Sequence, residues 1–399
     1  MSTVGSKRLG ALTVVDSRLR TTSLCLATDY GAWGDPRGQE GIAHLLEHLL
    51  IYTPLRGGHS LSDRVSRRGG YCNAETHADG MVFSVQVHPD DADLALELML
   101  EAVFAPSVDE ASLERERQAV LRELAALETD PSDLVQRTFA QRVLGDHPLA
   151  CPVGGTPASV ERLSIGQTLE AHGKLFLDSE FTLVSVGPRA PDAVRTTPGT
   201  PEPGGPVRPE PPSTDLSRPW EPPHAWTGDF VWMCVGSAAP PAGSPRRPAF
   251  NVLEFMLGSR STSLLNRALR VDRSLAYVFE AWYRGYSERG TWSVIVGAEA
   301  HHGEDILRAV RDCLADVAAG RCGEDFFDVA RKQAVMQLVR GSESPFDWAL
   351  HLAREAKSGV LGRDVGYETS RLEGVTFEDV RRAAQDILAG LTVVVETEA

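Results

Sequence analysis

A proline-rich stretch near the middle of the chain constrains its fold more than any other feature. Residues 188–223 hold twelve of the 25 prolines in the 399-residue sequence. Proline fixes φ and lacks a backbone N–H, so a stretch this rich in proline forms neither a helix nor a central strand and is typical of an extended linker. We therefore predict two domains of similar length, residues 1–187 and 224–399, joined by a Pro-rich linker at 188–223.

The two predicted domains show the same order of elements. The first has strand-like segments at 11–15, 22–28, 81–88 and 181–186, with helices that include 42–52 and 109–129. The second has strands at 229–235, 275–283, 291–298 and 391–396, and helices near 249–269, 304–319, 324–340, 346–358 and 376–389. Strand-rich starts and helix-rich ends favour an α+β fold class, with an antiparallel sheet and helices packed on one face in each of two homologous domains.

Two local matches indicate that the halves arose by duplication. The segment His44-Leu-Leu-Glu47-His48 corresponds to Asn251-Val-Leu-Glu254-Phe255 in the second half. Further along, Arg117-Gln-Ala-Val corresponds to Lys332-Gln-Ala-Val. Chance similarity between amphipathic helices is the alternative. Two matches in the same order, within the same succession of strands and helices, favour duplication.

The segment His44-x-x-Glu47-His48 is typical of a metal site on a helix. Residues four apart share a helix face, so the two imidazoles can reach one zinc ion. Glu47 lies beside them without having to be a ligand, and its carboxylate could accept a proton from an attacking water. The alternative is that these are ordinary histidines with no metal.

The predicted helix 109–129 offers a third ligand. Leu113, Glu116, Val120, Glu123 and Leu127 follow a 3-4-3-4 spacing, which places two glutamates in an otherwise apolar stripe. A carboxylate on a buried face is costly unless it is paired or binds a metal. Either this face is wet and its carboxylates are solvated, or Glu123 completes the zinc site begun by His44 and His48.

The second half lacks every proposed ligand. Its aligned residues are Asn251 for His44, Phe255 for His48 and Leu338 for Glu123, while the apolar pattern persists. We therefore expect one zinc ion per chain, bound by the first half only. A second histidine pair, His301-His302, is not expected to share a metal, because adjacent residues point to opposite faces of a strand or away from each other on a helix.

Composition narrows the classes of partner. Forty Lys and Arg against 55 Asp and Glu give a net charge of −15, which argues against nucleic-acid binding. No apolar run approaches the ~18 residues of a membrane-spanning helix. The six cysteines are scattered with no Cys-x-x-Cys pair, which favours a cytoplasmic protein with reduced thiols.

Taken together, these motifs resemble those of the pitrilysin/insulinase family of inverted-motif zinc peptidases, and the length resembles the mitochondrial-processing-peptidase-like subfamily. The likeness extends over most of both halves, the linker excepted. Beyond the ligand motif, the matching residues are Gly69-Gly70-x-x-Asn73-Ala74-x-Thr76, Glu116, and the pair Arg270 and Tyr277. One departure is Ile51-Tyr-Thr-Pro54, where relatives usually carry Phe-x-Gly-Thr.

The resemblance implies a zinc-dependent endopeptidase that acts on peptides or unfolded segments, including leader peptides. It assigns His44, His48 and Glu123 to zinc, Glu47 to general-base catalysis and Glu116 to orienting the ligands. Asn73 and Ala74 would bind an extended substrate, and Arg270 and Tyr277 would stabilise the oxyanion. It also implies a homodimer, or a heterodimer with a related subunit. The alternative function is a non-catalytic scaffold or partner subunit of a heterodimeric peptidase.

Overall fold

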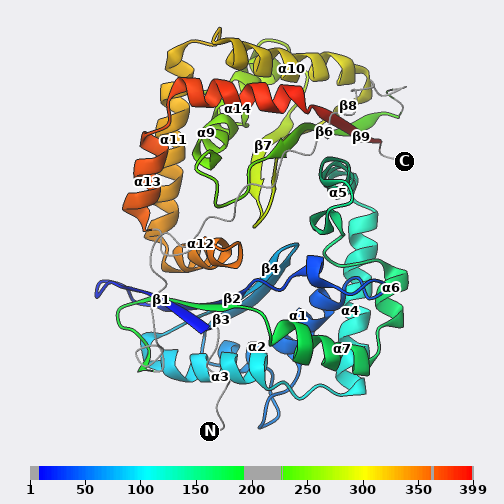
Figure 1. Cartoon of the computed structure of the whole chain (residues 1–399), viewed down its shortest axis with the longest axis vertical. Coiled ribbons are helices and arrows are strands. Elements are labelled where there is room, and N and C mark those ends of the chain that lie inside the picture. The colour runs from blue at the N-terminus through cyan, green and yellow to red at the C-terminus, as the bar shows by residue number, and fades with distance from the viewer. Residues whose placement is uncertain (1–8, 193–225, 227, 361–363, 398–399) are drawn as a thin grey trace. The chain divides into compact units, whose positions relative to one another are not determined.

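A computed structural model describes residues 9–192, 226, 228–360 and 364–397 (Figure 1). Most of the predicted linker, residues 193–223, lies outside the described residues. The chain forms two compact units. Unit 1 comprises Met1–Ala125, His147–Val207 and Gly341–Arg363, and unit 2 comprises Ala126–Asp146, Arg208–Arg340 and Asp364–Ala399.

Unit 1 is built on a five-stranded sheet. Its strand order is β1-β5-β2-β4-β3, with bounds β1 Leu9–Val15, β2 Thr22–Thr28, β3 Tyr71–His77, β4 Gly80–Val87 and β5 Phe181–Gly187. All neighbouring strands are antiparallel except β1 and β5, which are parallel. The last strand in the order, β3, is hydrogen-bonded to β4. One edge of this sheet is therefore formed by β3.

Helices α1 Ile42–Tyr52, α2 Leu61–Ser66 and α3 Ala92–Phe104 pack against one face of this sheet. Helices α4 Glu110–Glu128, α6 Pro157–Arg162 and α7 Ile165–Ala171 pack against α1 instead. Leu46 and Leu50 of α1 and Leu96 of α3 share a buried core with Leu26 and Phe83 of the sheet. A second buried cluster joins α1 to α4 through Leu45, Leu49, Leu113 and Val120. Helix α1 is thus held between the sheet and α4.

Unit 2 contains a four-stranded antiparallel sheet in the order β7-β8-β6-β9. The strand bounds are β6 Phe230–Ala239, β7 Val278–Gly285, β8 Gly290–Glu299 and β9 Thr392–Thr397. Its helices are α9 Arg247–Leu257, α10 Gly303–Ala319, α11 Glu324–Glu343, α13 Val365–Glu373 and α14 Phe377–Ala389. The helix predicted near 249–269 ends earlier, at Leu257, because Gly258 and a run of serines follow, and the sequence did not predict α13.

The second face of each sheet is covered by a helix from the other half of the sequence. In unit 1 this helix is α12, Pro345–Lys357, and every residue of β2 is consequently buried. Figure 1 shows α12 and α3 on opposite sides of that sheet. In unit 2 the helix is α5, Pro131–Leu144, whose Val135 and Phe139 pack against Ile295. We refer to α5 and α12 as the exchanged helices.

The exchanged helices begin in the same way. Asp130 caps α5 and Ser344 caps α12, and a proline follows each cap. A proline is favoured in the first turn of a helix but ends a helix that precedes it, so the long helices α4 and α11 stop here and the chain turns towards the other sheet. The predicted α+β class is confirmed. The sequence division at 187 and 224 places α5 and α12 differently from the compact units.

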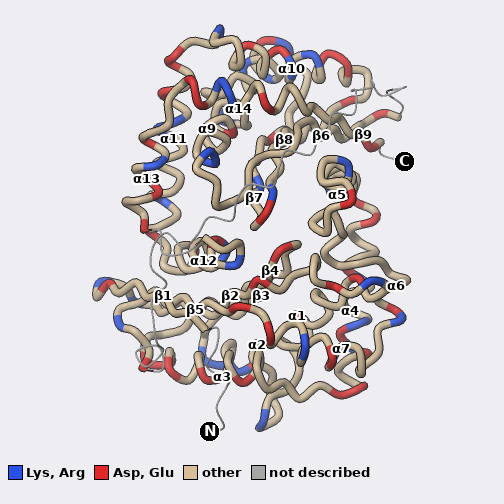
Figure 2. The backbone as a smooth tube through the Cα atoms, viewed as in Figure 1, with Lys and Arg blue, Asp and Glu red and all other residues tan. Residues whose placement is uncertain are grey.

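The exposed faces of the long helices carry both signs of charge. Red and blue segments alternate along α4 and α10 (Figure 2). On α10, Arg308 pairs with Glu304 at 3.2 Å and with Asp305 at 2.9 Å. Among the described residues, no helix combines the length and the apolar composition that crossing a bilayer requires.

Candidate metal centre and active site

Helix α1 presents the His-x-x-Glu-His motif, and a partly buried aspartate fixes where the helix begins. Gly41 at the N-cap has φ 94°, a conformation that favours glycine. Asp35 Oδ2 accepts a hydrogen bond from Gly41 N at 2.7 Å, and Asp35 Oδ1 accepts one from Ala43 N at 3.1 Å. These bonds satisfy free N–H groups of the first turn. Burial raises the pKa of Asp35 to about 7. Sequence reasoning missed Asp35, which precedes its helix by a loop.

Three predicted ligands converge. Glu123 Oε2 lies 3.6 Å from His44 Nε2 and 3.4 Å from His48 Nε2. The three donor atoms all lie within 4.8 Å of one another. The imidazole planes are nearly perpendicular, at 89°. The buried leucines on either side of the motif fix this arrangement by holding α1 against α4.

The arrangement fits a zinc ion. Donors about 2.0–2.1 Å from one tetrahedral ion lie about 3.4 Å from each other, which matches the spacing between the histidine nitrogens and the Glu123 oxygen. These separations also exceed the length of a good hydrogen bond. Burial, followed by the charge of His48, lowers the pKa of His44 to about 4, so this imidazole is neutral at neutral pH, as a ligand must be.

Glu116 lies behind His48. Its Oε2 is 3.7 Å from His48 Nδ1, the ring nitrogen that does not face Glu123, and its Oε1 accepts a hydrogen bond from Arg115 Nε at 3.3 Å. Burial alone would lower the pKa of His48, but the carboxylates of Glu116, Glu47 and Glu123 raise it overall. Glu116 thus has the location expected of a residue that fixes the ring orientation of a ligand.

Glu47 is held by a residue to which the sequence gave no role. Thr76 on β3 donates a hydrogen bond from Oγ1 to Glu47 Oε2 at 2.7 Å. Burial raises the pKa of Glu47, whereas the Thr76 bond and His48 act in the opposite direction. Thr76 lies three residues after Asn73, so its place in the Gly-Gly-x-x-Asn-Ala-x-Thr segment was the signal that could have identified it.

The predicted substrate-binding residues lie on the edge strand. Asn73 is in register with Ser84 of β4, and Ala74 with Phe83. The carbonyl of Asn73 accepts a hydrogen bond from Ser84 Oγ at 3.2 Å. Because β3 ends the strand order, its other edge has the backbone pattern that β-strand addition uses.

Arg270 and Tyr277 lie together in unit 2, near a turn of π-helix at Asn266–Val271. The Arg270 guanidinium carbon is 4.7 Å from the centre of the Tyr277 ring, and the Tyr277 side chain is 78% exposed. The two residues are therefore neighbours in unit 2. Their role in catalysis stays a prediction.

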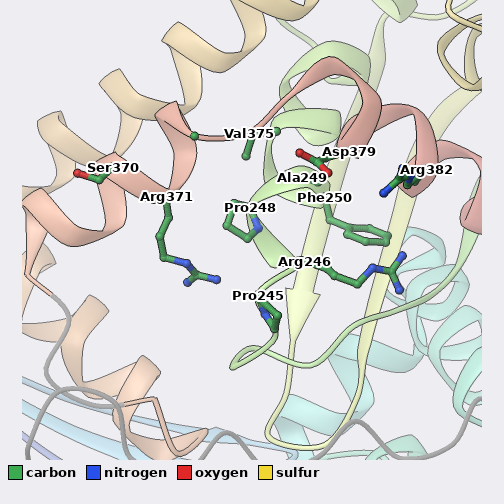
Figure 3. A pocket seen from close by; sticks show the side chains of 11 residues that line it. Pro245, Arg246, Pro248, Ala249, Phe250, Ser370, Arg371, Val375, Asp379 and Arg382 are labelled. Atoms are coloured by element: carbon green, nitrogen blue, oxygen red, sulfur yellow. The ribbon is translucent and has the colours of Figure 1, made fainter.

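A pocket of about 400 Å³ lies in unit 2 between the start of α9 and helices α13 and α14 (Figure 3). Three arginines line it, but each has a carboxylate partner. Arg246 pairs with Asp386, Arg371 with Glu368, and Arg382 with Glu378. Arg371 also donates to the carbonyl of Ser244 at 2.9 Å. Arg246 and Arg371 thus connect α14 and α13 to the segment before α9, whereas Arg382 pairs within α14.

Comparison with protein families extends over both halves. Residues 12–157, which include the complete ligand set, match the model described as insulinase (peptidase family M16). Residues 169–334 match the model described as the peptidase M16 inactive domain. The chain belongs to the insulinase family, peptidase family M16. The second match includes Asn251 and Phe255, which occupy the positions of the missing histidines in the insulinase-family repeat.

Relatives and solved structures resemble the chain over most of its length. An uncharacterized zinc protease of Mycobacterium tuberculosis is 27% identical, and the match covers 88% of this chain and 82% of that protein. One from Streptomyces coelicolor is 26% identical over 95% of this chain and 86% of that protein. A protease from Helicobacter pylori has the same fold, with a TM-score of 0.81, 17% identity and coverage of 98% and 97%.

Proposed function

We propose that this insulinase-family chain is a zinc-dependent endopeptidase that cleaves peptides or unfolded segments. The observation that carries the proposal is the convergence of His44, His48 and Glu123, at separations that suit one zinc ion. Relatives named zinc proteases support the same activity. The chain length supports membership of the mitochondrial-processing-peptidase-like subfamily, and trimming of leader peptides fits this activity.

His44, His48 and Glu123 would hold the ion. When bound, zinc supplies a Lewis acid that polarises the scissile carbonyl and a positive charge that favours ionisation of an attacking water. Glu116 keeps the His48 ring oriented from the opposite side. The half-exposed Glu123 carboxylate leaves this side of the cluster open to solvent and substrate.

Glu47 would move the proton. Its carboxylate accepts a proton from the attacking water and delivers it to the leaving amine as the peptide bond breaks. The Thr76 hydroxyl fixes one carboxylate oxygen, Oε2, which limits the rotation of the group. This oxygen remains able to accept a second hydrogen bond, because a carboxylate oxygen has two lone pairs.

The substrate would add to β3 as a further strand. Asn73 and Ala74 offer backbone groups at the edge of the sheet, so extended segments bind with little dependence on side chains. We propose that Arg270 and Tyr277 stabilise the oxyanion through their guanidinium and hydroxyl donors. Folded proteins would be poor substrates, because their backbone groups are already paired.

Metal analysis combined with cleavage mapping tests this function. The purified chain should hold about one zinc, lose activity to a chelator and regain it with zinc. Cleavage products from a mixed peptide library would then define the preferred sites. A well-folded chain that binds no zinc would refute the ligand assignment, and a zinc-loaded chain that cleaves nothing would favour the scaffold function.

We further propose a cytoplasmic dimer in which Arg270 and Tyr277 of one chain serve the zinc site of the other. The test mixes two inactive variants, Glu47→Gln and the double variant Arg270→Ala, Tyr277→Phe. In a homodimer completed in this way, each mixed dimer regains one intact site, and activity returns. Mixing without recovery, once subunit exchange is confirmed, would assign the pair to its own chain or to no catalytic role. A chain inactive alone but active with a related subunit would indicate a heterodimer.

A further inference from the structure

We propose that Glu299, His301 and His302 form a second divalent-metal site, in unit 2, separate from the His44–His48–Glu123 cluster. Their donor atoms all lie within 4.8 Å of one another. Glu299 Oε2 is 3.4 Å from His301 Nδ1. The two imidazole rings have centres 3.9 Å apart. The site goes beyond the proposed peptidase function, which uses none of these residues.

The local backbone explains why adjacent histidines meet here, contrary to the expectation from the sequence. Glu299 ends β8, Ala300–His302 form a single 3-10 turn, and α10 begins at Gly303. In a 3-10 turn successive side chains are about 120° apart, rather than the 180° of a strand, so neighbouring side chains can lean together. The prediction that His301 and His302 would point apart was therefore wrong.

The turn is anchored on its inner side. Ala300 is buried, and its N–H donates to the carbonyl of Asp229 at 3.0 Å. A Cβ at Gly303 would lie 2.1 Å from Trp226 Cε3, so the indole rests directly on the backbone of Gly303. The donors thus project from a turn whose backbone is fixed. Less ordering is needed to bring them onto one ion than in a free loop.

The donor set selects the class of ion. Two imidazoles and one carboxylate suit zinc, nickel or copper(II), whereas calcium and magnesium prefer oxygen ligands alone. Glu304 and Asp305 in the first turn of α10 share Arg308 as a partner, so a net negative charge remains to offset the positive end of the helix that a cation would meet. Glu299 and His301 are each 67% exposed, so water would complete the coordination. We expect this site to bind metal more weakly than the His44–His48–Glu123 cluster does. It should therefore fill only when metal is added to the purified chain.

Zinc titration of the full-length, metal-stripped chain tests the site. The wild type should bind about two equivalents, and the double variant His301→Ala, His302→Ala should bind about one. The double variant His44→Ala, His48→Ala should also retain about one, held in unit 2. His88→Ala is the matched control, because His88 is exposed and lies 3.4 Å from Asp90 but has no second histidine beside it. It should bind as much zinc as the wild type.

Trp226 gives a second, local measurement. Copper(II) binds such donors more tightly than zinc and quenches nearby indole fluorescence. Copper should quench the wild type more than the His301→Ala, His302→Ala variant, and Trp226→Phe should remove that difference. Equal zinc stoichiometry in the wild type and the His301→Ala, His302→Ala variant would overturn the proposal. Equal quenching in those two proteins would overturn it as well.

Discussion

Helices α1 and α9 occupy corresponding places in the two halves of the chain, and each carries a glutamate at the same position of its motif, buried in α1 and partly buried in α9. In α1, Glu47 is flanked by His44 and His48 and is bonded to the Thr76 hydroxyl. In α9, Glu254 accepts a hydrogen bond from the backbone N–H of Tyr283 at 3.0 Å. The same residue type therefore serves two purposes, set by what lies around it.

The residues around Glu254 show that α9 contributes to the core of unit 2 and carries no metal ligands. Phe255, the counterpart of His48, is buried in the core of unit 2 with Arg260 stacked 4.4 Å from its ring centre. Asn251 replaces His44, so no pair of imidazoles remains on this helix. A glutamate in a repeated motif is thus weak evidence for catalysis by itself. Whether such a glutamate can be catalytic depends on whether metal ligands lie beside it.

The largest contrast is expected from truncating the residues that distinguish the two helices. His48→Ala should lose tight zinc binding and essentially all turnover while remaining folded, because a two-ligand site binds zinc poorly. Phe255→Ala should keep zinc but lose about 3 kcal/mol of stability, since it empties a buried aromatic position. Zinc analysis and urea unfolding of both variants measure the two effects. Loss of zinc in Phe255→Ala without unfolding would contradict the separation of roles.

The paired glutamates give the next largest contrast. Glu47→Gln should bind zinc normally and lower kcat by about 10²–10⁴-fold, because an amide cannot accept the proton. Glu254→Gln should leave kcat near the wild-type value, because its amide oxygen can still accept from Tyr283 N. Steady-state kinetics on one peptide substrate compares them. If Glu47→Gln also lost its zinc, Glu47 would be a ligand rather than the base.

The sequence predicted that three candidate zinc ligands would meet, because their positions follow from local spacing. His44 and His48 are one helical turn apart, and Glu123 follows from the periodicity of its own helix. Asp35 and Thr76 reach the same helix from a loop and a strand, and pairing of that kind depends on tertiary contacts that periodicity does not encode. The same limit explains why the sequence did not place α5 and α12 on the correct sheets. Their amphipathic patterns predicted helices but not which sheet would bury them.

A smaller effect is expected at Thr76. Its hydroxyl donates to Glu47, whereas the matching glutamate of α9, Glu254, accepts from a backbone N–H. Thr76→Val keeps the shape and removes the hydroxyl, so kcat should fall about 10–100-fold with little change in KM, in line with about 1.5–3 kcal/mol for a hydrogen bond to a charged group. Thr76→Ser should restore most of the loss. A rise in KM with unchanged kcat would instead place Thr76 in substrate binding on β3.

The last contrast concerns stability and pH in unit 2. Burial raises the pKa of Glu254 from its ordinary value of 4.5 to about 7, although the hydrogen bond from Tyr283 N opposes the shift. The native state therefore holds this proton over a pH range in which the unfolded chain has released it. The stabilisation is full below about pH 4.5 and is lost as the pH rises through about 7, a change of roughly 3 kcal/mol.

Glu254→Gln cannot release a proton, so it should gain stability relative to the wild type as the pH is raised from about 5 to about 8. Urea midpoints measured at both pH values give the difference. Glu324→Gln, at the exposed start of α11, is the control. It shows how far removal of a surface carboxylate alone changes the pH dependence of the urea midpoint. Equal pH dependence in the wild type and Glu254→Gln would mean that Glu254 is ionised in the fold. The α9 carboxylate would then be charged, as a catalytic base must be, and only the missing metal ligands would distinguish α9 from α1.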